Sequence, residues 1–185
     1  MMRARNPKKT TLAIGDGAND VNMINAAHIG VGISGLEGQQ AASAADYAIG
    51  QFRFLKDLMF VHGREAYRRN AYAVCYIFYK NILETVPIWL FGVFSMFSAT
   101  VMYNSLLYVS YNLFYTAIPI IWYATFDWEY TREVLRKRPK LYSIGLQDRY
   151  FSNFEFCKWF FYAIFHSSLL LFLTFYTIDL VSPNI

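Results

Sequence analysis

The chain contains two kinds of hydrophobic pattern. Early in the sequence, short apolar runs alternate with glycine-containing turns, and later long apolar segments follow one another. The runs 10–14 (TTLAI) and 28–33 (HIGVGI) predict two buried strands, and residues 20–27 between them predict a helix. This order of strand, loop, helix and strand is typical of a doubly wound α/β fold. About 50 residues with two strands are too few to bury a sizeable core, so we expect residues 1–52 to be one piece of a larger domain.

Three later segments predict membrane-spanning helices: 71–94, 105–126 and 156–178. Each is long enough, at ~1.5 Å per residue, to cross a hydrocarbon layer of ~30 Å. Across the first two segments and their connection, the only charged side chains are Lys80 and Glu84. Such a low density of charge is typical of chain embedded in a bilayer.

The predicted organisation therefore has three parts. Residues 1–52 form an α/β piece, residues 53–70 form a stalk helix, and residues 71–185 form a transmembrane region with three spans. Pro87 and Pro119 lie inside the first and second predicted spans. Each should remove a backbone hydrogen bond and bend its helix.

Composition and charge agree with a membrane protein. The chain is 56% hydrophobic and 16% charged, against about 25% charged in soluble domains. This balance, with a mean hydropathy of +0.23, excludes a disordered chain and argues against a purely water-soluble domain. Lysine and arginine precede the first span and fill the loop 127–155, whereas the connection 95–104 has none. Because basic residues accumulate on the cytosolic side, we expect a multi-pass protein with its N-terminus and the 127–155 loop in the cytosol.

The same charge distribution bears on partners and compartment. The formal net charge is +4, and the bias of the membrane loops accounts for it without a nucleic-acid partner. Two cysteines are too few for a disulfide framework, and their spacing does not suggest zinc.

The turn after the first predicted strand carries the chemistry of the α/β piece. It reads GDGAND, so Asp16 and Asp20 flank the start of the following helix and Asn19 lies between them. Open α/β folds bind ligands at the carboxyl ends of strands, and Mg²⁺ takes one or two carboxylates together with phosphate and water. The turn therefore indicates a magnesium site in which Asn19 and nearby N–H groups hold phosphoryl oxygens. The alternative is a glycine turn with a helix N-cap, which needs only one acid.

These residues also carry a family resemblance. GDGAND is similar to the Mg²⁺-binding signature of P-type ATPases, whose phosphorylation domain has the haloacid-dehalogenase-like fold. Further blocks resemble the type IV P-type ATPases, the phospholipid flippases, and they follow in the family's order. They are GISGLEGQQA (32–41), DYAIGQFRFL (46–55), VHGREAYRR (61–69), FYKN (78–81) and YNLFYTAIP (111–119).

The resemblance implies roles for the α/β piece. Asp16 and Asp20 would be Mg²⁺ ligands beside a phosphorylated aspartate, and Asn19 would support the phosphoryl group. The family's phosphorylation motif, DKTGT, does not occur in this sequence, so no nucleophile is assigned. ATP would be bound mainly by parts that this chain lacks. We therefore expect a C-terminal fragment that is catalytically incomplete alone, either a truncated gene model or a degraded gene.

The resemblance also implies a substrate path in the membrane region, whose spans would correspond to membrane helices five to seven. Lys80 and Asn81 match positions near the phospholipid path, where a lysine would attract the phosphate of the head group. Asn112 is a polar neighbour from the second span, and an interhelical hydrogen bond without function is the alternative for it. An internal ion pair between Lys80 and Glu84, which are four residues apart, is the alternative.

Three functions fit these patterns. The leading one is a fragment of an ATP-driven flippase that moves phospholipid toward the cytosolic leaflet, with phospholipid and a glycosylated accessory subunit as partners. The second is a non-catalytic membrane protein that binds lipid or a partner subunit. The third is a fragment of a cation-transporting P-type ATPase. Hard cations need oxygen ligands, so Lys80 disfavours a cation pump, whereas Glu84 keeps that alternative open.

Overall fold

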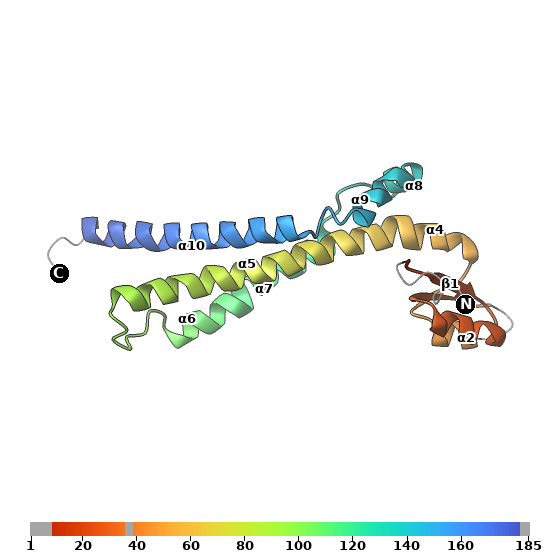
Figure 1. The fold of residues 1–185 in the computed structure, drawn as a ribbon, viewed down its shortest axis with the longest axis horizontal. Helices are drawn as coiled ribbons and strands as arrows, with labels where there is room; N and C mark the ends of the chain where they lie inside the picture. The colour runs from red at the N-terminus through yellow and green to blue at the C-terminus, as the bar shows by residue number, and fades with distance from the viewer. Residues whose placement is uncertain (1–8, 36–38, 182–185) are drawn as a thin grey trace. The chain divides into compact units, whose positions relative to one another are not determined.

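The computed structural model describes residues 9–35 and 39–181, with side chains described up to Ile178. The chain divides into two compact units, Met1–Gly63 and Arg64–Ile185. Figure 1 shows the elements of each unit, and the two units are described separately below.

The first unit contains a three-stranded parallel sheet in the order β1-β2-β3. Its strands are β1 (Leu12–Gly15), β2 (Ile29–Ile33) and β3 (Tyr47–Ile49). The two predicted strands are confirmed with slightly shifted ends. The third strand was not predicted, because its three residues are too few to show a period and two of them are exposed.

Short helices connect these strands. After β1 come a 3₁₀ turn, η1 (Ala18–Asp20), and α2 (Val21–Ala26), and α3 (Gln40–Ala44) precedes β3. The helix predicted at 20–27 is therefore confirmed, although its first turn is 3₁₀. The doubly wound arrangement remains a prediction.

The core of the first unit lies along β2. Val31 is fully buried, and Ile24 of α2 and Ala41 of α3 pack on the same strand region. A Cβ at Gly32 would lie 2.4 Å from the Cα of Ala42, so α3 can approach β2 this closely only because the strand carries a glycine there.

A helical segment follows β3. It comprises η2 (Phe52–Phe54), α4 (Leu55–Asp57) and a π-helical stretch, η3 (Leu58–Gly63), before α5 (Arg64–Phe94) begins. Helical backbone thus continues from Phe52 to Phe94. The assignment of residues 53–70 as a stalk stays a prediction.

The second unit is built on two long helices, α5 and α10 (Asn153–Val181), which lie side by side and run in the same direction (Figure 1). Aromatic side chains meet between them, since Tyr72 and Tyr79 of α5 both contact Trp159 of α10 edge-on. Small residues of both helices are buried: Ala71, Cys75, Ala163 and Ser167. Small side chains let helix backbones approach closely, which is how membrane helices commonly pack.

The predicted second span is not one regular helix. It consists of α6 (Ser105–Ser110), a π-helical stretch, η4 (Tyr111–Tyr115), and α7 (Ala117–Phe126), with a break at Thr116. Pro119 lacks an N–H group for the carbonyl of Tyr115, and its ring clashes with that carbonyl. The N–H of Thr116 instead donates to the carbonyl of Tyr111 at 3.1 Å, the five-residue spacing of a π-turn.

Two helices within the described residues are long and apolar enough to cross a membrane, Phe52–Phe94 and Asn153–Ile178. They contain the first and third predicted spans. The predicted count of three regular spans is thus not confirmed, because the middle segment is broken at Thr116. The loop that follows it folds into α8 (Arg132–Lys137), η5 (Pro139–Tyr142) and α9 (Ser143–Leu146).

Candidate functional site

The loop that follows β1 brings Asp16 and Asp20 together. The backbone N–H of Asp16 donates to Oδ2 of Asp20 at 3.3 Å. A Cβ at Gly15 would lie 2.3 Å from the Cβ of Asp20 and 2.7 Å from its Oδ2. The Asp20 side chain therefore lies directly against the backbone of Gly15, at the carboxyl end of the strand.

The donor set of this loop fits Mg²⁺. Asp16 and Asn19 are exposed and Asp20 is half-buried, so these three residues of the loop are accessible to a ligand. Within the described residues, no cluster of three or more His, Cys, Asp or Glu side chains could hold a metal ion. Asp16 and Asp20 would thus supply two ligands, and phosphate and water would complete the shell, as is usual for Mg²⁺.

Two further residues of the first unit fix the strands beside this loop. Nδ1 of His28 accepts from the N–H of Thr11 at 3.1 Å, and Oδ2 of Asp46 accepts from the N–H of Gly30 at 2.8 Å. These contacts hold the start of β1 to β2 and satisfy a backbone donor of β2. Sequence reasoning did not find them, because their partners are 17 and 16 residues away along the chain.

In the second unit, Lys80 of α5 lies in a polar cluster with the broken middle segment. Nζ of Lys80 donates to Oδ1 of Asn112 at 2.9 Å and to Oγ1 of Thr116 at 3.2 Å. The Asn112 side-chain amide donates in turn to both oxygens of Glu84, at 3.2 and 3.0 Å. Asn112 therefore bridges the cation and the anion of the predicted first span.

The alternative of a direct ion pair between Lys80 and Glu84 is wrong. The ion pairs found among the described residues include neither side chain. Asn81 lies one residue further along α5 and is exposed. The structure thus brings Lys80 and Asn112 into contact but does not bring Asn81 into the hydrogen bonds of the cluster.

Three residues of the cluster were missed at the level of sequence. The hydroxyl of Tyr76 donates to the carbonyl of Thr116 at 3.2 Å, and the hydroxyl of Tyr111 donates to the carbonyl of Lys80 at 3.2 Å. Thr116 itself is buried, and its hydroxyl donates to the Tyr111 and Asn112 carbonyls at 3.0 and 3.2 Å. The sequence signal was the polar spacing of Tyr111, Asn112 and Thr116 within an apolar segment, since i and i+4 residues share a helix face.

A second polar network lies at the start of α5. Arg64 pairs with Glu65 at 2.6 Å and with Glu129 at 2.7 Å. Arg68 pairs with Glu65 at 2.9 Å and with Asp127 at 2.6 Å. The Arg64 and Glu65 side chains are only 1% and 3% exposed, so these charges are almost completely removed from solvent. The network joins α5 to the segment that follows α7.

Tyr150 completes this network on the loop side. Its hydroxyl accepts from Arg64 at 3.0 Å and donates to Glu129 at 2.9 Å. Burial tends to raise the pKa of the Glu129 carboxyl, but the hydrogen bonds from Arg64 and Tyr150 and the charges of Arg64 and Arg68 outweigh it and lower the pKa below 4.5. Burial and the hydrogen bond to Glu129 raise the pKa of Tyr150 to about 12.

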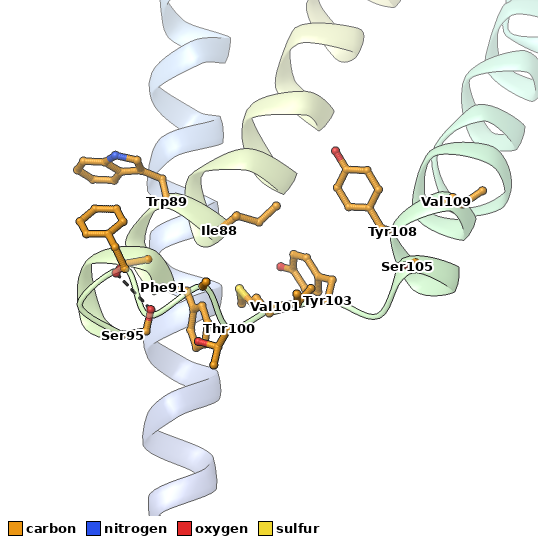
Figure 2. A pocket seen from close by; sticks show the side chains of 14 residues that line it. Ile88, Trp89, Phe91, Ser95, Thr100, Val101, Tyr103, Ser105, Tyr108 and Val109 are labelled. Carbon is orange, nitrogen blue, oxygen red and sulfur yellow. Dashed lines mark hydrogen bonds between the residues drawn. The ribbon is translucent and has the colours of Figure 1, made fainter.

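Two cavities lie in the second unit near the connection between α5 and α6. The larger, about 620 Å³, is lined by the end of α5, the connection and α6. Figure 2 shows Ile88, Tyr103 and Tyr108 around this space. The smaller, about 420 Å³, also reaches η4 and α10 and includes Glu84 in its lining.

The fold and these sites define the class of the protein: an α/β unit with two aspartates in the loop after its first strand, followed by long apolar helices that carry a polar cluster. A family model described as phospholipid-translocating P-type ATPase C-terminal matches residues 42–184, and one described as haloacid dehalogenase-like hydrolase matches residues 3–51. The chain belongs to the phospholipid-translocating P-type ATPases.

Curated relatives agree over most of this chain. The probable phospholipid-transporting ATPase 12 of Arabidopsis thaliana is 44% identical over 165 residues, which are 89% of this chain and 14% of the relative. The human phospholipid-transporting ATPase ID is 45% identical over 90% of this chain and 14% of its own length. The phospholipid-transporting ATPase DRS2 of Saccharomyces cerevisiae is 43% identical over 91% of this chain and 12% of its own length. The chain therefore spans about one seventh or less of the length of these relatives.

Proposed function

We propose that this chain is part of an ATP-driven pump that moves phospholipid to the cytosolic leaflet. The observation that carries the proposal is a polar cluster around Lys80 inside apolar helices that match the phospholipid-translocating family over residues 42–184. Ionisable groups inside membrane segments are energetically unfavourable and mark substrate paths or partner contacts. Phospholipid carries an anionic phosphate, which a buried ammonium group attracts.

The α/β unit would hold Mg²⁺ through Asp16 and Asp20. The ion, when bound, would neutralise charge on a phosphoryl group during its transfer. Asn19 is exposed at the same strand end, where its amide can donate to a phosphoryl oxygen. The nucleophilic aspartate and most contacts to ATP would come from segments outside this sequence, so we expect no ATP hydrolysis by this chain alone.

The second unit would hold the phosphate of the lipid head group at Lys80. An ammonium group has three N–H donors, and two of those on Lys80 are directed to Asn112 and Thr116. The third donor can serve a phosphate oxygen. Asn81 is exposed beside Lys80 and would meet a lipid approaching from outside the cluster.

The topology follows from the charge pattern. The N-terminus and the 127–155 loop would lie in the cytosol, which puts the Arg64 network on the cytosolic side and the connection 95–104 on the opposite side. The resemblance to flippases also supports a glycosylated accessory subunit as a partner. A cation pump is less well supported, because the ammonium group of Lys80 lies in the same polar cluster and repels a metal cation.

A chimera tests the proposal. The segment of yeast DRS2 that matches this chain would be replaced by residues of this chain, since the two are 43% identical over 168 residues. We expect the purified, reconstituted chimera to hydrolyse ATP in response to phospholipid and to move fluorescent phospholipid between leaflets. Asp16→Asn should abolish ATP hydrolysis, and Lys80→Ala should reduce its stimulation by lipid about tenfold, or about 1.4 kcal/mol.

Lys158→Ala is the matched control, because Lys158 lies at the start of α10 and pairs with Glu155 rather than with the cluster. This variant should keep normal lipid stimulation. An active chimera whose lipid stimulation is the same with Lys80 and with alanine would remove Lys80 from the substrate path.

A further inference from the structure

The smaller cavity of the second unit contains one charged residue. Its lining comes from α5, the 95–104 connection, α6, η4 and α10, and Glu84 is the only charged member. A carboxylate in an apolar, membrane-embedded cavity is energetically unfavourable unless a cation or hydrogen-bond donors compensate it. The described residues supply donors from Asn112 but no ion pair to Glu84.

The Asn112 amide leaves some hydrogen-bond acceptor positions of the Glu84 carboxylate free. A carboxylate offers about four lone-pair positions, and a single amide nitrogen approaches its two oxygens at 3.2 and 3.0 Å. The amide is also neutral, so it does not compensate the charge of a carboxylate. Because Glu84 lines the cavity, this charge faces the cavity space.

Apart from Thr174, the other residues of the lining that carry a polar group are tyrosines. Four of them, Tyr103, Tyr108, Tyr111 and Tyr115, line the same cavity as Glu84. The face of an aromatic ring carries negative potential and attracts ammonium and quaternary ammonium groups. A carboxylate among several aromatic rings is therefore suited to an organic cation rather than to an anion.

Lys80 is placed to bind the negative charge of a ligand whose positive charge lies at Glu84. Lys80 and Glu84 are one helical turn apart, about 6 Å along the α5 axis, and Asn112 contacts both. In a choline or ethanolamine head group, a two-carbon linker separates the anionic phosphate from the cationic nitrogen. The lysine, the glutamate and their spacing are thus complementary to a zwitterionic head group.

We infer that Glu84 and the surrounding tyrosines bind the ammonium group of a zwitterionic phospholipid while Lys80 binds its phosphate. The inference rests on the proposed function, and it names the head-group class and assigns a specificity-determining role to Glu84. A head group without a cation, such as that of phosphatidic acid, gains nothing from Glu84 and is repelled by it.

Access to this site is through the larger cavity. The two cavities share Met102, Tyr103 and Tyr108, so they adjoin. Figure 2 shows Tyr103 and Tyr108 between the end of α5 and the start of α6, where the larger cavity lies next to the connection. A head group entering at the connection reaches Glu84 past these two rings.

Lipid binding by the full chain in nanodiscs tests the inference without requiring ATP hydrolysis. The probes are spin-labelled phosphatidylcholine and spin-labelled phosphatidic acid, and the readout is the fraction of each lipid immobilised by the protein. We expect the full chain to prefer phosphatidylcholine, and Glu84→Gln to reduce that preference about tenfold with little change for phosphatidic acid. Glu84→Asp should retain much of the preference because it keeps the charge.

Glu155→Gln is the control for a lost carboxylate, since Glu155 pairs with Lys158 on α10 and is absent from the lining of the cavity. It should leave the preference unchanged. Equal loss of both lipids in Glu84→Gln would overturn the inference, because it would assign Glu84 a purely structural role.

Competition experiments distinguish a site for an organic cation from a site for a metal ion. Free tetramethylammonium should displace phosphatidylcholine, and sodium or potassium at the same concentration should not. Displacement by the metal ions would overturn the inference in favour of an inorganic cation site. Since binding is measured without transport, an inactive DRS2 chimera with intact binding would reject only the proposed function, and an active chimera with no phosphatidylcholine preference would reject only this inference.

Discussion

Arg64 and Glu129 lie 2.7 Å apart, although 65 residues separate them along the chain. Their contact joins the first residue of α5 to the segment that follows α7. Since the Arg64 side chain is 1% exposed, the contact replaces water around a guanidinium group. The middle segment is irregular at Thr116, so its position depends on such contacts rather than on a continuous helix.

Replacing Arg64 by alanine should strongly destabilise the second unit. The change leaves Glu65 buried without its closest cation, and breaking a buried pair on one side destabilises by about 3 to 5 kcal/mol. The midpoint of unfolding of the purified chain in detergent, followed by tryptophan fluorescence, would measure this. Arg149→Ala, at an exposed position of the same loop region, should shift the midpoint little. Equal shifts for the two variants would contradict a structural role for the network.

The same network should limit stability at both ends of the pH range. The pKa of Glu129 is lowered from 4.5, so its contribution is present above that pH and is lost as the pH falls through the lower folded value. The pKa of Tyr150 is raised from 10.0 to about 12, so its contribution is present below pH 10.0 and is lost as the pH rises toward 12. Unfolding midpoints measured across this range should form a plateau between the two limits.

Glu129→Gln separates the two limits. The variant removes the acidic titration and should flatten the acid side of the profile. The loss of stability above pH 10.0 should become smaller but persist, because burial of Tyr150 still raises its pKa after the hydrogen bond to the Glu129 carboxylate is lost. An acid limb unchanged in Glu129→Gln would assign the acid instability to other carboxylates.

The pattern of hydrophobic and polar residues predicted those helices and strands that depend mainly on neighbouring residues in the sequence. The strands β1 and β2, the helix between them and the two long helices follow from residue period and hydrophobicity. Strand β3 was missed because it is short and partly exposed. The helix is interrupted near Pro119, as expected from the loss of a backbone hydrogen bond there. A proline alone does not specify that the Thr116 N–H and hydroxyl donate to the Tyr111 carbonyl.

The candidate sites, too, were predicted where neighbouring residues carry a signal and missed where tertiary packing creates the contact. Asp16 and Asp20 are four residues apart and were found from spacing, and their contact follows from the close approach that Gly15 permits. The polar cluster was found only in part, because the sequence indicates that Lys80 needs a partner without specifying Thr116 or the two tyrosine hydroxyls. The Arg64 contact to Glu129 carries no local signal, since tertiary packing creates it.

Asn112→Leu should destabilise the second unit by about 1 to 3 kcal/mol. The change removes the acceptor of Lys80 and the donor of Glu84, and a buried polar group without a partner carries its full desolvation penalty. Unfolding in detergent measures the change. The triple variant Lys80→Met, Glu84→Leu, Asn112→Leu should recover the lost stability, because replacing all partners by apolar groups is close to neutral.

Activity measurements on the same variants distinguish a loss of stability from a loss of function. In the DRS2 chimera, the triple variant should fold and still lose lipid-stimulated ATP hydrolysis, because the charges that we propose to hold the head group are gone. Full lipid stimulation in the triple variant would show that the cluster only packs the helices.

Gly15→Ala should weaken the proposed magnesium site, because a Cβ there would lie 2.3 Å from the Cβ of Asp20 and 2.7 Å from its Oδ2. The contact is closer than any real Cβ tolerates, so the Asp20 carboxylate must move away from Asp16 and from the strand end. Gly17 offers a matched control in the same loop, since a Cβ there would meet nothing within 4 Å. In the DRS2 chimera, the Mg²⁺ concentration for half-maximal ATP hydrolysis should rise about tenfold in Gly15→Ala and stay nearly unchanged in Gly17→Ala. Since both variants replace a loop glycine by alanine, a general loss of glycine flexibility would affect both, and equal Mg²⁺ dependence would reject the placement of Asp20 as a ligand.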